Sequence, residues 1–265
     1  MTSSSKAFVP LKRLSFGETY RRDTWWLKPL FYFVVLSAFV GYATYRAFAG
    51  GYYAAGPYLS PFFSPEIWGD SPHAWFGPKP GWIPDWLPFT PALVILPFPG
   101  LFRFTCYYYR GAYYKSHWAS PVACAVGKPQ KNYRGEQKLP LILQNVHRYF
   151  LYFALLFLVF LSHDVYLGFF GWRDGFHVNV GSLVLLINVV LLSGYAFGCH
   201  SLRHLLGGKH DILSNRPLAM RLWRGVTWFN RRHGGWAMPS LFWVAWTDVY
   251  VTLVARGVIT DYRIF

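Results

Sequence analysis

The sequence predicts an all-α integral membrane protein built from five transmembrane helices. Of its 265 residues, 54% are hydrophobic, 21% are aromatic and only 14% are charged, whereas about 25% of the residues of an ordinary soluble domain are charged. Five apolar runs, at about 29–49, 90–109, 141–163, 178–199 and 237–255, approach or exceed the roughly 20 residues that a tilted membrane helix needs. The many Trp, Tyr and Phe side chains fit the aromatic belts at membrane surfaces. A soluble all-helical protein is the alternative.

The runs differ in how regular a helix they predict. The second, 90–109, contains Pro97, Pro99 and Arg103. Proline removes a backbone donor and bends a helix, so this span is the least regular of the five. The fifth carries Asp248 near its middle, where an ionisable group costs at least ~2.5 kcal/mol on insertion scales.

The lysines and arginines predict how the helices are oriented in the membrane. If successive connections alternate between the two sides, residues 1–28, 103–148 and 203–232 carry 21 Lys and Arg, and the other side carries five. Basic residues concentrate on the cytoplasmic side of membrane proteins. We therefore expect a multi-pass protein of the cell membrane, with its N-terminus in the cytoplasm and its C-terminus outside.

Two connecting segments have a character of their own. Residues 1–28 are basic and aromatic, and they predict an amphipathic segment on the cytoplasmic surface ahead of the membrane domain, 29–265. A simple positively charged flank is the alternative. The stretch 50–88 holds eight of the 18 prolines together with four tryptophans, and it predicts a cap lying along the outer membrane surface.

Cysteines and histidines collect at the predicted cytoplasmic ends of the spans. Six side chains are expected in this one leaflet: Cys106, Cys124, Cys199, His147, His200 and His204. His200 and His204 are four residues apart, so they share one helix face. A lone cysteine in an apolar helix is usually a small buried hydrophobe, and a lone histidine at a helix end is often only hydrogen-bonded. All six together favour a metal centre over either of these uses.

The residues leave the kind of metal open. Three cysteines cannot form a site of four thiolates. Two thiolates with two imidazoles suit zinc or a Rieske-like [2Fe–2S] cluster. A bis-histidine haem b could be held by His147 with His200 or His204, and a second haem by His163 with His177.

Three long motifs resemble a known family. FTCYYYRGAYYKSHWASPVACAVG (104–127), LPLILQNVHRYF (139–150) and GCHSLRHLLGG (198–208) are similar to the large single-chain membrane anchor of bacterial succinate dehydrogenase, respiratory complex II. The order of the spans also looks like the cytochrome b anchor of succinate:quinone oxidoreductases. The family is expected to have a second cysteine between the two histidines of the last motif, and here Leu202 occupies that position.

The resemblance implies a function in electron transport. The partners would be a flavoprotein that oxidises succinate and an iron–sulfur subunit, docked on the basic cytoplasmic face, and the complex could form a higher oligomer. The chain would be a non-flavin subunit with no dehydrogenase site, in keeping with the absence of a glycine-rich dinucleotide motif. Electrons would pass to a quinone, for which menaquinone is the expected type.

A redox centre in such a subunit favours the Rieske-like cluster over zinc, which has no redox chemistry. The expected ligands are Cys106, Cys124, His200 and His204, with Cys199 set aside because its position next to His200 turns it off the shared helix face. His147 remains able to replace either histidine. Haem b remains the alternative cofactor.

Further residues are candidates for quinone and proton chemistry. The expected quinone-binding residues are Arg110, Ser116, His117, Trp118, His147 and Arg148. Contact with lipid phosphate or with a docked subunit is an equal alternative for the basic ones. Asp248 is a candidate proton relay, with pairing to a buried Arg or Tyr as the structural alternative. A proton-coupled transporter is the rival function, supported by Asp248 and the proline-broken second span.

Overall fold

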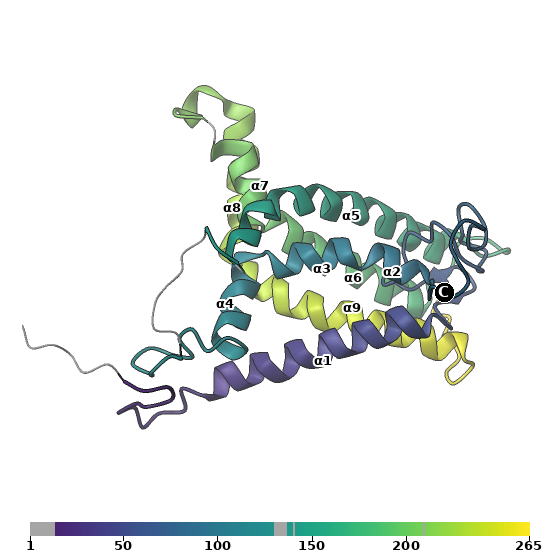
Figure 1. Cartoon of the computed structure of the whole chain (residues 1–265). Coiled ribbons are helices and arrows are strands. Elements are labelled where there is room, and N and C mark those ends of the chain that lie inside the picture. Colours follow the sequence, from purple (N-terminus) through teal and green to yellow (C-terminus); the bar gives the residue numbers. More distant parts are fainter. Residues whose placement is uncertain (1–13, 130–136, 140, 209) are drawn as a thin grey trace, which may run out of the picture.

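The structure is a computed structural model that describes residues 14–129, 137–139, 141–208 and 210–265. Its framework is four long helices that run along a common direction (Figure 1): α1 (Leu27–Ala49), α5 (His147–Phe170), α6 (Val180–Phe197) and α9 (His233–Ala255). Each is long and apolar enough to cross a membrane. They correspond to the first, third, fourth and fifth predicted spans. An all-helical membrane protein is therefore confirmed.

The predicted second span is not a single helix. It is divided into α2 (Pro91–Ile95) and α3 (Pro97–Phe104), and a third helix, α4 (Tyr107–Ser116), follows. Pro97 has no backbone N–H to donate to the preceding turn, so a new helix begins there. α3 packs beside α5, whereas α4 turns away and packs against α1 (Figure 1). The expectation of five membrane spans is thus not confirmed, because four helices among the described residues reach the length of a span.

The two ends of the bundle differ in composition. At the end on the left of Figure 1, α1, α5 and α9 begin and α3 and α6 end. We call it the basic end, because it holds the three Lys- and Arg-rich segments of the sequence. The opposite end, which we call the cap end, holds the connection 50–90 and the C-terminus (Figure 1).

The connection at the cap end lies partly inside the bundle. It contains the short antiparallel pair β1 (Ala54–Ala55) and β2 (Tyr58–Leu59). The side chains of Phe62 and Phe63, which follow, are buried. Trp82 and Trp86, farther along, are exposed. Only the second half of the connection thus resembles the surface cap expected from the sequence, because its first half fills the space between the helices.

Close helix packing depends on a small residue in α6. A Cβ atom added at Gly194 would lie 2.4 Å from the ring of Trp236 on α9. No side chain could occupy that space unless the two helices moved apart. Gly194 therefore lets α6 and α9 approach each other next to the end of the bundle where the cysteines lie.

The remaining elements lie at the basic end. They are η1 (Leu141–Val146), α7 (His200–Arg203), η2 (His204–Gly208), η3 (Leu213–Asn215) and α8 (Pro217–Arg231). The helices α7 and α8 project across the direction of the bundle and extend beyond its outline (Figure 1).

The predicted N-terminal segment, 1–28, is described only from residue 14 onwards, and its first 13 residues lie outside the described part. Residues 14–26 do not form a helix. Their backbone pairs with the loop that follows α4, through Gly17 N–H to the Gly127 carbonyl at 3.1 Å and Gly127 N–H to the Glu18 carbonyl at 2.9 Å. These hydrogen bonds attach the described part of the N-terminal segment to the loop after α4, and its predicted position at the membrane surface stays a prediction.

Candidate functional site

Two buried cysteines occupy equivalent positions at the basic end. Cys106 separates α3 from α4, and Cys199 separates α6 from α7. Both residues have nearly the same extended backbone, with φ and ψ of −68° and 135° for Cys106 and −65° and 135° for Cys199. Both follow the pattern Phe-x-Cys-x-x-x-Arg, in FTCYYYR (104–110) and FGCHSLR (197–203). Two apolar helices thus end in the same way and direct a thiol to the same region.

Histidines from neighbouring helices contact both thiols. Nε2 of His147, the first residue of α5, lies 3.1 Å from the sulfur of Cys199. Nε2 of His233, the first residue of α9, lies 3.4 Å from the sulfur of Cys106. Burial raises the pKa of the Cys199 thiol to about 11, so with no metal bound this thiol is neutral at pH 7.

The hydrogen bonds of His147 determine which ring nitrogen carries the proton. The Thr105 hydroxyl donates to the Leu101 carbonyl at 2.7 Å, and its oxygen lies 2.8 Å from Nδ1 of His147. Since its proton is already used, the hydroxyl accepts from Nδ1–H. Nε2 is then unprotonated, with its lone pair directed towards Cys199. A histidine that donates from one ring nitrogen in this way, and so keeps the other nitrogen unprotonated, is typical of a metal ligand.

A cavity of about 400 Å³ lies among these groups. It is lined by Cys106, Tyr107, His147, Cys199, His200, Asn230 and His233. Within the described residues, no group of three or more Cys, His, Asp or Glu is already close enough to hold one metal ion. The donor set, two thiols and three imidazoles, nevertheless suits a two-cysteine, two-histidine centre. The Nδ1 atom of His233 is buried and has no hydrogen-bond partner in the described structure. These residues fit such a group.

The four ligands expected from the sequence are not brought together. Cys106 and His200 line the cavity, but Cys124 and His204 do not. Cys124 is exposed in the loop after α4, where its carbonyl accepts from Arg21. His204 is exposed because α7 ends at Arg203 and the chain leaves the bundle there. Four residues of helix advance by about 6 Å, so a shared face does not keep both histidines beside one cavity.

Cys199 and His233 line the cavity but are not among the four ligands expected from the sequence. Cys199 was set aside on the assumption that one continuous helix carries it and His200. The repeated Phe-x-Cys-x-x-x-Arg pattern was a signal that could have identified it. His233 lies in the run NRRHGGW (230–236) and carries no local signal of its function.

The two histidines considered for a second haem, His163 and His177, have different surroundings. His163 is exposed and stacks beside Tyr166, with ring centroids 6.5 Å apart. His177 is buried against Trp172 and lies 3.1 Å from the Asp174 carboxylate.

The residues expected to bind quinone fall into separate places. Ser116 and His117 lie against α1, where the Ser116 hydroxyl donates to the Ala112 carbonyl at 2.8 Å and lies 2.8 Å from Nδ1 of His117. The other ring nitrogen of His117 lies 3.2 Å from the Ser37 hydroxyl. Burial lowers the pKa of His117. These groups largely satisfy one another.

The other members of that set are dispersed. Trp118 packs against Tyr113 and Tyr114, and the Arg110 guanidinium lies over the ring of Tyr107. His147 lines the Cys/His cavity and Arg148 is exposed. The six residues therefore do not form one slot.

A second cavity, also of about 400 Å³, is almost entirely apolar. It lies among α1, α2, α3, α5, α6 and α9, and its polar members are Thr44, Arg103 and Tyr195. Aromatic rings lie between the two cavities. Phe102 lines the apolar cavity and stacks on His147 at 4.8 Å between ring centroids, and Tyr195 lines it and stacks on His233 at 5.0 Å. The buried Tyr195 hydroxyl has no hydrogen-bond partner in the described structure.

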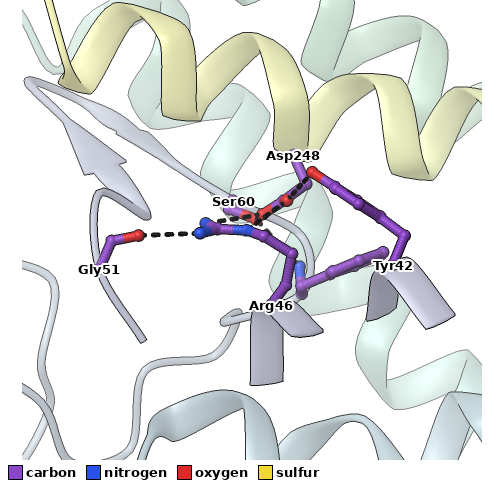
Figure 2. Close-up of polar contacts among 6 residues, drawn as sticks. Tyr42, Arg46, Gly51, Ser60 and Asp248 are labelled. Carbon is purple, nitrogen blue, oxygen red and sulfur yellow. Dashed lines mark hydrogen bonds and ion pairs between the residues drawn. The ribbon is translucent and has the colours of Figure 1, made fainter. Parts of the chain in front are cut away.

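Asp248 lies in a buried network that joins α9, α1 and the cap connection (Figure 2). Its carboxylate accepts from Tyr42 Oη at 2.5 Å, Arg46 Nε at 2.7 Å, Arg46 Nη2 at 3.3 Å and Ser60 Oγ at 2.5 Å. Arg46 also donates to the Gly51 carbonyl at 3.0 Å. This is the arrangement expected of the structural alternative, pairing with a buried Arg and Tyr. The four donors occupy the acceptor positions of the carboxylate.

The fold and site together define a class: multi-pass helical membrane proteins with buried cysteines and histidines around a cavity at one end of the bundle. The family model of the Actinobacterial succinate dehydrogenase subunit SdhC matches residues 27–257. A solved structure, the Mycobacterium smegmatis Sdh1 complex in the apo form, contains a chain 42% identical to this one. The alignment covers 97% of this chain and 98% of that chain, with a TM-score of 0.86. No curated protein matches.

The chain belongs to the Actinobacterial succinate dehydrogenase subunit SdhC family. The resemblance found in the sequence is thereby confirmed. The protein is a multi-pass membrane subunit of a succinate dehydrogenase complex, and it has other subunits as partners.

Proposed function

We propose that this subunit receives electrons from succinate oxidation at its basic end and delivers them to a quinone within the membrane. The observation that carries the proposal is the convergence of two buried thiols and three imidazoles on one cavity of a succinate dehydrogenase membrane subunit. The expected partners are a flavoprotein and an iron–sulfur subunit docked on the basic end, which would face the cytoplasm.

The proposed cofactor is a Rieske-like [2Fe–2S] cluster. Cys106 and Cys199 would supply the thiolates, and two of His147, His200 and His233 the imidazoles. When bound, such a cluster supplies one-electron chemistry at a potential raised by the neutral imidazole ligands, which eases transfer to a quinone. Thr105 fixes the His147 ring in the tautomer that a ligand needs. This set replaces Cys124 and His204 by residues that line the cavity, and the set expected from the sequence becomes the alternative.

The apolar cavity is the better candidate for the quinone, expected to be menaquinone. It offers an apolar slot of suitable size, and the Tyr195 hydroxyl, which lies beside the Cys106 thiol, is the candidate donor for a quinone carbonyl. The rings of Phe102 and Tyr195 place this slot directly beside the histidines of the proposed centre. Ser116 and His117 lack such a donor, so a role for them in quinone binding has less support.

The experiment compares matched cysteine and histidine variants of the purified complex by EPR of the reduced protein. Cys106→Ser, Cys199→Ser and His147→Ala should lose a rhombic signal of low average g and should lose quinone reduction. Succinate oxidation by an artificial acceptor at the soluble subunits should persist. Cys124→Ser and His204→Ala are the controls, because these exposed residues lie outside the cavity, and both should keep the signal.

Each other outcome identifies a different centre. Loss of the signal in Cys124→Ser and His204→Ala, with Cys199→Ser unaffected, would restore the ligand set expected from the sequence. A sharp α-band on reduction with no such signal in any variant would show haem b instead. Iron and acid-labile sulfide analysis of the same samples separates these cases.

A further inference from the structure

The helix α8 at the basic end has an exposed half with two distinct stripes. On a helical wheel, Leu218 and Leu222 follow one line at a spacing of four residues. Arg221, Arg224 and Arg231 lie on the neighbouring side, with Trp228 among them. Leu218, Leu222 and Trp228 are 69%, 47% and 49% exposed.

The opposite side of α8 is already occupied. The Trp223 ring packs closely on Gly207. A Cβ atom added at Gly207 would lie only 2.5 Å from that ring. Arg203 of α7 lies over the same Trp223 ring at 4.5 Å and donates to the Thr227 hydroxyl at 3.1 Å. The helices α7 and α8 thus form one packed unit, and the striped half of α8 faces away from it.

Within the described part of the chain, the arginines of that half have no anionic partner. Residues 212–247 contain no Asp or Glu. Among the residues that the structure describes, no carboxylate pairs with Arg221, Arg224 or Arg231. This surface therefore carries uncompensated positive charge beside exposed apolar side chains.

The position of α8 indicates what covers this surface. The four long helices set the direction of the membrane normal, and α8 runs across that direction and extends beyond the bundle at the basic end (Figure 1). A helix in this position, projecting sideways from a membrane bundle, lies at the level of the lipid headgroups. Apolar side chains beside arginines, with a tryptophan between them, are the pattern of a helix that lies in a membrane surface.

We infer that α8 is an interfacial helix that binds anionic phospholipids of the leaflet at the basic end. Leu218 and Leu222 enter the boundary of the acyl chains, whereas the Phe229 ring packs inward on Phe197 and Trp236. Arg221, Arg224 and Arg231 bind the lipid phosphates. Since each arginine near an anionic surface strengthens binding by about fivefold at low salt, three of them make the preference for anionic lipid measurable.

The test uses the complete complex in vesicles of phosphatidylcholine, with or without phosphatidylglycerol. A spin label is attached at Leu222→Cys in the Cys124→Ser background, because Cys124 is exposed and would otherwise react. We expect the label to be relaxed by oxygen, which dissolves in the bilayer, far more than by a water-soluble nickel chelate. Changing Arg221, Arg224 and Arg231 together to Gln should reduce co-purified phosphatidylglycerol by tenfold or more. The largest expected effect is about fivefold for each arginine removed.

Changing the same three residues to Lys is the matched control. The lysine variant keeps the charge and should retain the lipid, and its elution from a sizing column shows whether the complex still assembles. A label that is accessible to water in both vesicle types would overturn the inference. So would a label immobilised identically with and without phosphatidylglycerol and released only when the soluble subunits are stripped, because α8 would then bind protein.

Discussion

At the scale of single residues, the chemistry of the Cys/His cavity depends on which polar atoms have a hydrogen-bond partner and which do not. Thr105 satisfies one nitrogen of His147 and leaves the other directed at Cys199. By contrast, the Tyr195 hydroxyl is buried with no partner in the described structure. A buried hydroxyl that lacks a partner costs about 1–3 kcal/mol. A ligand that accepts from Tyr195 would recover this free energy.

Tyr195→Phe tests whether that ligand is quinone. We expect the KM for quinone to rise about tenfold, because one hydrogen bond contributes roughly 1–1.5 kcal/mol. The EPR signal of the centre should be unchanged, because the phenyl ring still stacks on His233. The measurement is quinone-dependent turnover with succinate, together with EPR of the same sample. An unchanged KM would place the quinone elsewhere, in a site such as that expected around Ser116 and His117.

At the scale of the elements, α1 is the least enclosed of the four long helices. Only 6% of the residues in its most apolar stretch are buried inside the protein. Arg46, 3% exposed, and Asp248, fully buried, therefore form a clamp between α1 and α9 near the cap end (Figure 2). Ser60 attaches the cap connection to the same carboxylate. This clamp accounts for an aspartate in a membrane helix without a transport function.

Removing one partner of this clamp should destabilise the complex more than removing both. Asp248→Ala or Arg46→Leu leaves an uncompensated buried charge, which costs on the order of 3–5 kcal/mol, and the double variant should recover part of that loss. The measurement is thermal unfolding of the purified complex in detergent. Asp248→Asn supplies the opposing result, since a proton relay predicts lost quinone turnover at unchanged thermal stability.

At the scale of the whole molecule, charge and chemistry are segregated along the membrane normal. The basic segments, both buried cysteines and His147, His200 and His233 lie at one end. The cap connection and the C-terminus lie at the other. This arrangement places the proposed electron entry on the side where basic residues would attract soluble subunits.

Labelling with an impermeant thiol reagent tests the orientation. Phe76→Cys in the Cys124→Ser background should react in intact cells, because Phe76 is 69% exposed at the cap end. The native Cys124, exposed at the basic end, should react only in inverted vesicles. The reverse pattern would place the basic end outside and would contradict both the topology and the docking face.

The sequence by itself determined the class of the protein, four of its membrane helices and the family. Apolar runs of span length and long motifs such as FTCYYYRGAYYKSHWASPVACAVG (104–127) are local features, readable without coordinates. The sequence also located Cys106, His147 and His200 as candidates for one region, because the ends of spans can be assigned to a side.

Only the tertiary structure decided which side chains meet. Cys199 lines the cavity because α6 ends before it, and His204 does not because it lies one turn beyond His200, in η2. His233 reaches the cavity from α9, more than 30 residues after Cys199 in the chain. Asp248 meets Arg46 across about 200 residues. Such contacts depend on where helices end and how they pack, and packing at that distance leaves no periodic signal in the sequence.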